Sequence, residues 1–307
     1  MNNVAPVFLI VFLGYWIRRW NIIDAQFSRM ASRFVFTVTL PALIFTSLVR
    51  TDFYQTFNSR QVVVGIVATL ISYAFVWIVS IFFTHDGRDR GVFIQGSYRG
   101  NFAIIGFAII YNLFGSDLMS NAAILLAFAM PLYNVLAVIA LTVPLNSERN
   151  IPVKKIMFDI LTNPLIIAAL VSVPWSLLKV GAPKVMMTSL DYLAGVTLPL
   201  ALVGIGASLD FHKIKAEFSR ALAATIIKIV ILPTTLTWFS WRLGVTGEAL
   251  GILFILYGAP TAIASYIMAE AMGGNRELAA NIVLISTLGS IFTLALGIYL
   301  LRSIGII

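Results

Sequence analysis

The sequence of 307 residues contains no cysteine and only two histidines, His85 and His212, which lie between apolar runs. This absence excludes disulfides, thiol catalysis and metal sites built from cysteine and histidine. Charged residues make up 11% of the chain, against about a quarter in soluble domains. No paired carboxylates lie within the apolar runs, and we predict no catalytic residue, no metal site and no cofactor.

The abundant residues are apolar: 60% of the chain is hydrophobic, and the mean hydropathy is +0.95. We therefore predict an all-α polytopic membrane protein with ten transmembrane helices. The runs close to the roughly 20 residues that cross a bilayer are 4–17, 34–49, 62–84, 91–114, 122–145, 156–178, 192–209, 221–241, 249–272 and 280–301. The first run is interpreted as a retained helix, because its positive charges follow it, unlike those of a signal peptide.

The net charge of +8 is interpreted as topology and contact with lipid headgroups, because the basic residues flank the apolar runs. Loops after the odd-numbered helices hold more Lys and Arg than the other loops do. Basic loops stay in the cytoplasm. We therefore predict a multi-pass protein of the inner membrane, with both termini on the non-cytoplasmic side.

An internal repeat divides the chain into two halves. Residues 38–53, VTLPALIFTSLVRTDF, match residues 196–211, VTLPLALVGIGASLDF, 158 positions later (196 − 38). Because each half holds five helices, an odd number, the halves face opposite sides of the membrane. The predicted domains are residues 1–148 and residues 149–307, each a five-helix repeat, with the two halves inverted. The small residues of GIGAS, 204–208, indicate close helix packing.

Two stretches interrupt the fourth and ninth runs with small and polar residues: GSYRGNFAIIG at 96–106 and YGAPTAIAS at 257–265. Pro260 has no N–H group and frees a carbonyl one turn earlier, which lipid cannot satisfy. Inverted-repeat carriers bind substrate where such broken helices meet. We predict that the broken fourth and ninth helices cross and form the site. A simple kink at Pro260 is the alternative.

Two cations, Arg99 and Lys228, lie in apolar runs with no acidic residue within a helical turn. Placing a charge there costs at least about 2.5 to 3.5 kcal/mol, so such a residue normally faces a cavity or a partner. Both suggest a negatively charged substrate. Arg99 pairing with backbone carbonyls, and Lys228 locking its helix to the broken one, stay open. The predicted substrate-binding residues are Arg99, Gly100, Asn101, Asn134, Lys228, Pro260, Thr261 and Ser265.

At these residues the chain resembles the auxin efflux carrier family. The matching segments are APVFLIVFLGYWIRR, VTLPALIF, SYRGNFAIIG, TNPLIIAAL, LVGIGASL, IIKIVILP and GAPTAIASYIMAEAMGGN. The resemblance implies a scaffold of helices 1, 2, 6 and 7, a transport unit of helices 3–5 and 8–10, homodimers and elevator-like movement. It places the substrate at Asn101 and the Pro260 region. Two departures are that no proline follows Gly106 closely, and that only about ten residues, 146–155, replace a long loop.

The predicted function is secondary or facilitated transport of small organic anions, either auxin-like or dicarboxylates such as malate and malonate, as the resemblance implies. The alternative is a sodium- or proton-coupled carrier of a neutral or bile-acid-like solute. A membrane enzyme is disfavoured, because its chemistry needs a nucleophile or metal cluster within the bilayer. The expected partners are the organic anion, the lipid bilayer and a second copy of the chain; no nucleic acid is expected.

Overall fold

Helices make up the described chain, as expected where lipid cannot satisfy free backbone groups. The computed structural model describes residues 5–50, 57–145, 158, 161–162, 164–178, 182–208 and 217–307. The helices of the first half are α1 Ala5–Arg19, α2 Ala25–Phe34, η1 Val35–Thr39, α3 Leu40–Val49, α5 Ser59–Phe83, α6 Gly87–Tyr98, η2 Phe102–Gly106, α7 Phe107–Phe114 and α8 Met119–Thr142. Those of the second half are α10 Pro164–Leu178, α11 Lys184–Ser208, α12 Phe218–Ile226, η4 Ile227–Ile231, α13 Leu232–Arg242, α14 Gly247–Gly258, α15 Ile263–Ala271 and α16 Arg276–Ser303.

Several of these helices have the length and composition of membrane spans. Among the described residues, five helices are long and apolar enough to cross a membrane, and three shorter apolar helices accompany them. The five are Ser59–Phe83, Met119–Thr142, Lys184–Ala207, Phe218–Arg242 and Arg276–Ser303. The predicted class, an all-α membrane protein, is confirmed. The count of ten spans and the division into two inverted repeats stay predictions.

Hydropathy located the helices but misplaced some of their starts. The run predicted at 34–49 belongs to a helix that begins at Ala25, and the run at 192–209 to one that begins at Lys184. The missed part of the first, α2, is amphipathic: Ser28 is buried while Gln26 is exposed. A search for uniformly apolar windows cannot find a helix that has one polar face. The predicted loop at 146–155, His212, and the ends of both repeat segments lie outside the described residues.

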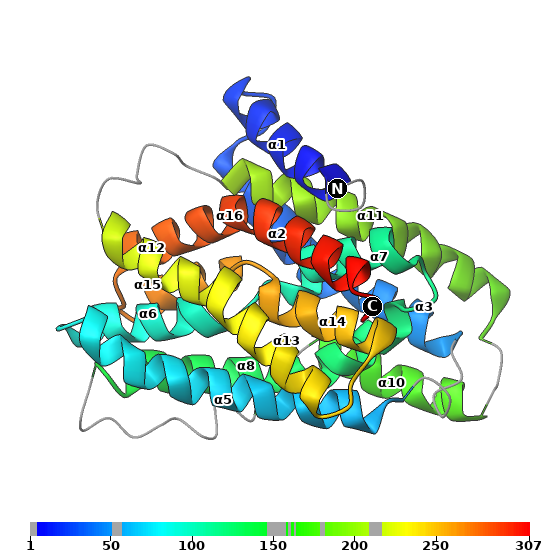
Figure 1. The fold of residues 1–307 in the computed structure, drawn as a ribbon. Coiled ribbons are helices and arrows are strands. Elements are labelled where there is room, and N and C mark those ends of the chain that lie inside the picture. The colour runs from blue at the N-terminus through cyan, green and yellow to red at the C-terminus, as the bar shows by residue number, and fades with distance from the viewer. Residues whose placement is uncertain are drawn as a thin grey trace.

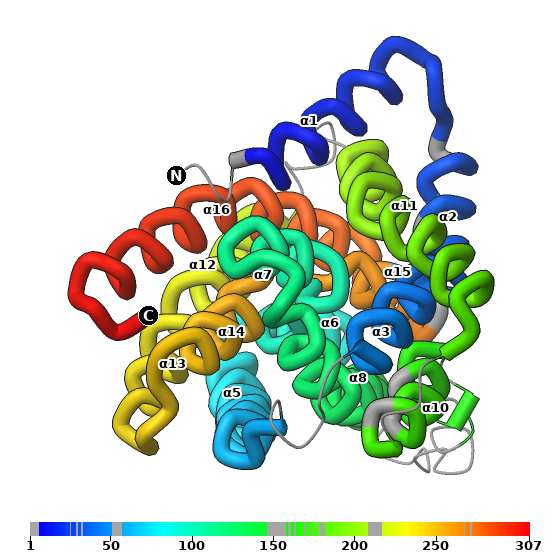
Figure 2. Tube along the Cα trace, turned by 90° about the vertical axis from the view of Figure 1, so that its right-hand side faces the viewer, coloured from blue at the N-terminus to red at the C-terminus, as the bar shows by residue number. Residues whose placement is uncertain are grey.

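One group of helices packs around α11. Helices α1, α2 and α3 contact α11, and α10 contacts α3; they gather on the right of Figure 2. Glycines allow the close approach of α1 and α11. A Cβ atom at Gly206 would lie 1.8 Å from the Val11 carbonyl oxygen, and one at Gly14 would lie 2.3 Å from that of Val203. The packing predicted for residues 204–208 is therefore present.

A second group surrounds α6. Helix α6 contacts α5, α8, α12 and α16, while α14 contacts α13 and α16 (Figure 1). The two groups contain the helices predicted for the scaffold and for the transport unit, and those roles stay predictions.

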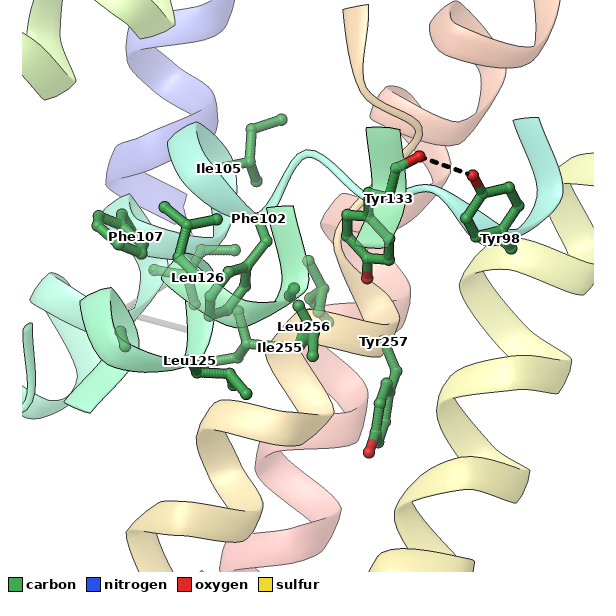
Figure 3. Packing of buried hydrophobic residues seen from close by; sticks show 14 of the residues in the cluster. Tyr98, Phe102, Ile105, Phe107, Leu125, Leu126, Tyr133, Ile255, Leu256 and Tyr257 are labelled. Atoms are coloured by element: carbon green, nitrogen blue, oxygen red, sulfur yellow. Dashed lines mark hydrogen bonds between the residues drawn. The ribbon is translucent and has the colours of Figure 1, made fainter. Parts of the chain in front are cut away.

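The hydrophobic core lies beside the two interrupted helices. Phe102 and Phe107 follow the first interruption and are fully buried. Figure 3 shows them gathered with Leu126 of α8 and Leu256 of α14. Large apolar side chains therefore fix the segments on either side of the interruptions.

Candidate functional site

The structure interrupts both runs at the predicted places. Helix α6 ends at Tyr98, and the helical chain resumes at Phe102. Helix α14 ends at Gly258, and α15 begins at Ile263. Non-helical backbone at Arg99 in the first run, and at Ala259 and Ala262 in the second, separates the two parts of each broken helix. The prediction that Gly100 and Asn101 would mark the first break is confirmed. The first break is residues 99–101, and the second is residues 259–262.

The two breaks are bonded to each other through their main chains. The Asn101 N–H donates to the Pro260 carbonyl at 2.7 Å, and the Ala262 N–H donates to the Arg99 carbonyl at 3.2 Å. Between them, Gly100 and Thr261 pair as an isolated antiparallel bridge. Breaking a helix leaves backbone groups without partners, and in an apolar interior each such group costs energy. Each break therefore provides hydrogen-bond partners for some of the backbone groups that the other break leaves free.

Gly100 makes the close approach possible. A Cβ atom at this position would lie 3.1 Å from the Leu256 carbonyl oxygen, 3.2 Å from that of Ala259 and 3.3 Å from Nζ of Lys228. Any larger residue at the crossing would press on the backbone of the second broken helix.

Lys228 binds the end of α14. It is 1% exposed and lies in η4, a widened turn that ends two residues before Pro233. A proline lacks the N–H that a regular turn needs, which favours such widening. The ammonium donates to the Tyr257 carbonyl, one of the last in α14. A cation there complements the negative helix end, so the geometry matches the alternative in which Lys228 locks its helix to the broken one.

Thr261 supplies a hydrogen-bond donor to the C-terminal end of α6, as Lys228 does to that of α14. Its hydroxyl donates to the Gly96 carbonyl at 2.6 Å, while its own N–H donates to the Ser286 hydroxyl at 3.1 Å. The C-terminal ends of both α6 and α14 thus receive a side-chain donor. Ser286 is a site residue that the predicted set did not include.

The two helix beginnings at the crossing lack such caps. Neither Asn101, before η2 and α7, nor Ala262, before α15, supplies a side-chain hydrogen bond to the helix that follows it. The first N–H groups of a helix point outward with partial positive charge. Among the described residues, the C-terminal ends at the crossing therefore receive side-chain donors, while the residues before its two helix beginnings supply no side-chain cap, and this distribution favours an anion.

Arg99 lies beside this crossing with neutral partners. It is 4% exposed; Nη2 donates to Oδ1 of Asn134 at 2.8 Å, and Nη1 contacts the Met268 sulfur at 2.7 Å. With its amide turned to suit its neighbours, Gln95 accepts from Nη1 at 3.3 Å and donates to the Ser265 carbonyl at 3.2 Å. Within the described part of the chain, Arg99 forms no salt bridge. Its charge is hydrogen-bonded but not neutralised.

The predicted residues are brought together, and most of them are buried. Arg99, Asn134 and Ser265 share one cluster, which reaches Gly100, Pro260 and Thr261 through the bonded breaks. The Ser265 hydroxyl is buried without a hydrogen-bond partner among the described residues. Of the eight predicted residues, Asn134 alone is half-buried rather than buried. The roles of all eight in substrate binding stay predictions.

Prediction from sequence missed Gln95 and Met268, which complete the surroundings of Arg99. Gln95 gave a signal, because a polar side chain one turn before Arg99 in an apolar run is expected to have a partner. Met268 gave none, because a thioether in an apolar helix has the appearance of ordinary core.

Interrupted, mutually bonded helices in an all-α membrane protein are typical of membrane transporters. The chain matches the family model described as "Membrane transport protein" over residues 1–298. It belongs to this family, the auxin efflux carrier family, as the resemblance predicted.

Proteins from several prokaryotes are similar to this chain over nearly its whole length. A putative malonate transporter of Rhizobium meliloti is 24% identical over 309 residues, covering 98% of this chain and 95% of that protein. The uncharacterized transporter YfdV of Escherichia coli strain K12 is 23% identical over 317 residues, covering 98% of both chains. An uncharacterized transporter of Methanocaldococcus jannaschii is 21% identical over 308 residues, covering 96% and 97%. The similarity therefore spans the whole chain.

Proposed function

We propose that this protein is a secondary or facilitated carrier of small organic anions. Its substrates are dicarboxylates such as malonate and malate, or auxin-like carboxylates, crossing the inner membrane of a prokaryote. The name of the Rhizobium relative supports malonate as the first substrate to test.

The observation on which the proposal rests is the environment of Arg99. The partners of this buried guanidinium are the amide oxygens of Asn134 and Gln95 and the Met268 sulfur, and no carboxylate among the described residues pairs with it. A buried charge without a countercharge is expensive, and a carboxylate can accept two parallel hydrogen bonds from a guanidinium. A substrate carboxylate that replaces a weak acceptor such as the Met268 sulfur therefore gains more binding free energy at Arg99 than a neutral solute does.

The helix ends add to this preference. The beginnings of the helices at Phe102 and Ile263 supply partial positive charge next to Arg99. Ser265 offers a hydroxyl in the same cluster that has no hydrogen-bond partner within the described part of the chain. Lys228 contributes positive potential, although its ammonium is held by α14.

The proposed transport cycle uses ten spans arranged as two inverted five-helix repeats, with both termini on the non-cytoplasmic side. The group around α11 is the static scaffold and forms a homodimer. The group around α6 carries the crossing and moves against it, which exposes the substrate to one side at a time. The elevator-like movement and the dimer come from the family resemblance.

Uptake into proteoliposomes that contain the purified protein tests the proposal. Labelled malonate and labelled malonamide have the same carbon skeleton, and malonamide is uncharged. We expect malonate to enter at least about tenfold faster, because charge-assisted hydrogen bonds are roughly twice as strong as neutral ones. Uptake of malonamide at the malonate rate would contradict an anion site at Arg99.

The same vesicles separate the coupled-carrier alternative. Sodium and pH gradients are imposed one at a time, with an ionophore as the control. A strict requirement for either gradient, together with uptake of neutral solutes, would favour the sodium- or proton-coupled carrier. Malonate uptake in the absence of both gradients would favour facilitated anion transport.

A further inference from the structure

A cleft of about 730 Å³ lies away from the crossing. One wall consists of α1, α3 and α11, and the other of α7, the loop after it and the start of α8. None of the eight predicted substrate-binding residues lines this cleft. Its volume lies in the range of sites for small molecules.

The mouth of the cleft holds charges of both signs. Arg50, at the end of α3, and Asp191 of α11 form an ion pair with Nη2 and Oδ2 at 2.5 Å. Asp117 lines the facing wall, where it accepts a hydrogen bond from Ser116. The side chains of Arg50 and Asp191 are 56% and 39% exposed, so both can reach a solute that enters from water.

The interior of the cleft is mostly apolar, although the buried side chains of Thr46 and Ser120 also line it. Leu43 of α3, Leu198 and Leu202 of α11, and Val7 of α1 line it, and the last two are fully buried. From Asp191 to Leu202 the lining follows α11 for eleven residues (202 − 191), or about 16 Å at 1.5 Å per residue. A ligand there meets charge at one end and a mostly apolar wall with a few hydroxyl groups along its length.

We infer that this cleft binds an α-amino acid with an apolar side chain, in its zwitterionic form. The Arg50–Asp191 pair uses one nitrogen and one oxygen, and among the described residues the other guanidinium nitrogens and Oδ1 have no partner. A carboxylate and an ammonium held on one carbon match these two unused edges. The apolar side chain then extends from this pair along α11 toward Leu198.

Ligands with a single charge fit this mouth less well. A carboxylate alone can use Arg50 but is opposed by Asp191 and Asp117, which together outnumber the cation. An amine alone can use the carboxylates but leaves the guanidinium edge of Arg50 without a partner. The exposed pair itself contributes at most about fivefold to an equilibrium, so it can adjust to admit the ligand.

Three probes with one phenyl ring test this inference on the purified full-length protein: L-phenylalanine, phenylacetate and phenethylamine. Isothermal titration should show phenylalanine binding up to about fivefold more tightly than either analogue, since each contact with a solvent-exposed charge is worth up to about that factor. The Arg50→Gln variant should lose the preference for phenylalanine over phenethylamine. The Asp191→Asn variant should lose the preference over phenylacetate.

Two controls separate this site from the rest of the protein. Arg60→Gln removes an exposed cation outside the cleft, whose guanidinium donates to the Gly244 carbonyl, and should leave phenylalanine binding unchanged. Arg99→Gln should leave it unchanged too, because Arg99 does not line the cleft. A loss of anion transport in Arg99→Gln with phenylalanine binding intact would keep the two sites distinct.

The inference is overturned by any of three results. These are no phenylalanine binding, equal affinity for phenylalanine and a singly charged analogue, or the same change of selectivity in the Arg50 and Asp191 variants. If Arg50→Gln does not fold, Asp191→Asn alone tests the inference. An ion pair with a purely structural role would leave the relative affinities for phenylacetate and phenylalanine unchanged in this variant, whereas the inference predicts that phenylacetate gains affinity relative to phenylalanine.

Discussion

Replacing Gly100 with alanine tests the contact between the two breaks. The added Cβ would lie between two carbonyl oxygens of the second broken helix, those of Leu256 and Ala259, at 3.1 and 3.2 Å. Leu256 lies within α14, and Ala259 directly precedes Pro260, whose carbonyl accepts a hydrogen bond from Asn101 across the crossing. The ammonium of Lys228, at 3.3 Å, closes a third side. The methyl group therefore cannot be accommodated by rotation of a side chain alone.

The expected cost follows from this geometry. Overpacking of a tight interior costs about 1 to 3 kcal/mol. In a chain of this size, each kcal/mol corresponds to a shift of about 2 °C in the melting temperature. We therefore expect Gly100→Ala to melt about 2 to 6 °C lower than the wild type. Malonate uptake should fall as well, because the shifted carbonyls belong to the crossing.

The matched control is Gly195→Ala in α11, where a Cβ atom meets no other atom within 4 Å. There alanine should stabilise the helix by up to about 1 kcal/mol. Thermal unfolding of the detergent-solubilised protein measures both variants, and vesicle uptake is recorded in parallel. Wild-type melting and uptake in Gly100→Ala would refute the view that the breaks are pressed together at this residue.

Two further substitutions test the supports of the crossing. Thr261→Val removes the donor to the buried Gly96 carbonyl and should lower the free energy of unfolding by about 1 to 3 kcal/mol, measured by thermal melting. The control Thr261→Ser keeps the hydroxyl and should melt like the wild type. Equal melting of the two variants would contradict a supporting role for this hydrogen bond. Asp89→Asn removes the carboxylate that accepts from Arg220 and Asn275 at the start of α6. It should lower stability by about 1 kcal/mol, with the difference shrinking in high salt because Arg220 is partly exposed; a loss that is independent of salt would show that the ion pair is not its cause.

Much of the crossing could be predicted from sequence because lipid makes polar residues costly. Gly100, Asn101 and Pro260 interrupt apolar runs, and the presence of such residues in both halves favoured two breaks over a simple kink at Pro260. The same argument identified Arg99 and Lys228 as buried cations. Their partners could not be predicted, because hydrogen bonding to Asn134 or to the Tyr257 carbonyl depends on how separate helices are rotated.

Other features left no pattern in the sequence. The beginning of the helix at Ala25 has mixed polarity, which a hydropathy window averages away. The cleft exists because the side chains of α3 and α11 do not fill the space in front of α7. How helices pack against one another cannot be read from the sequence of any one of them. The Arg50–Asp191 pair joins residues 141 positions apart and could not be told from ordinary loop charges.

The most direct test of the central claim, that the buried and unneutralised Arg99 receives the anion, is the dissociation constant of malonate for Arg99→Gln. The matched control is Arg276→Gln, which removes an exposed cation paired with Glu270. Loss of a charge-assisted pair at a buried site corresponds to at least about a tenfold weaker constant. We predict that loss for Arg99→Gln and no change for Arg276→Gln. An unchanged constant in a folded Arg99→Gln protein would contradict the account.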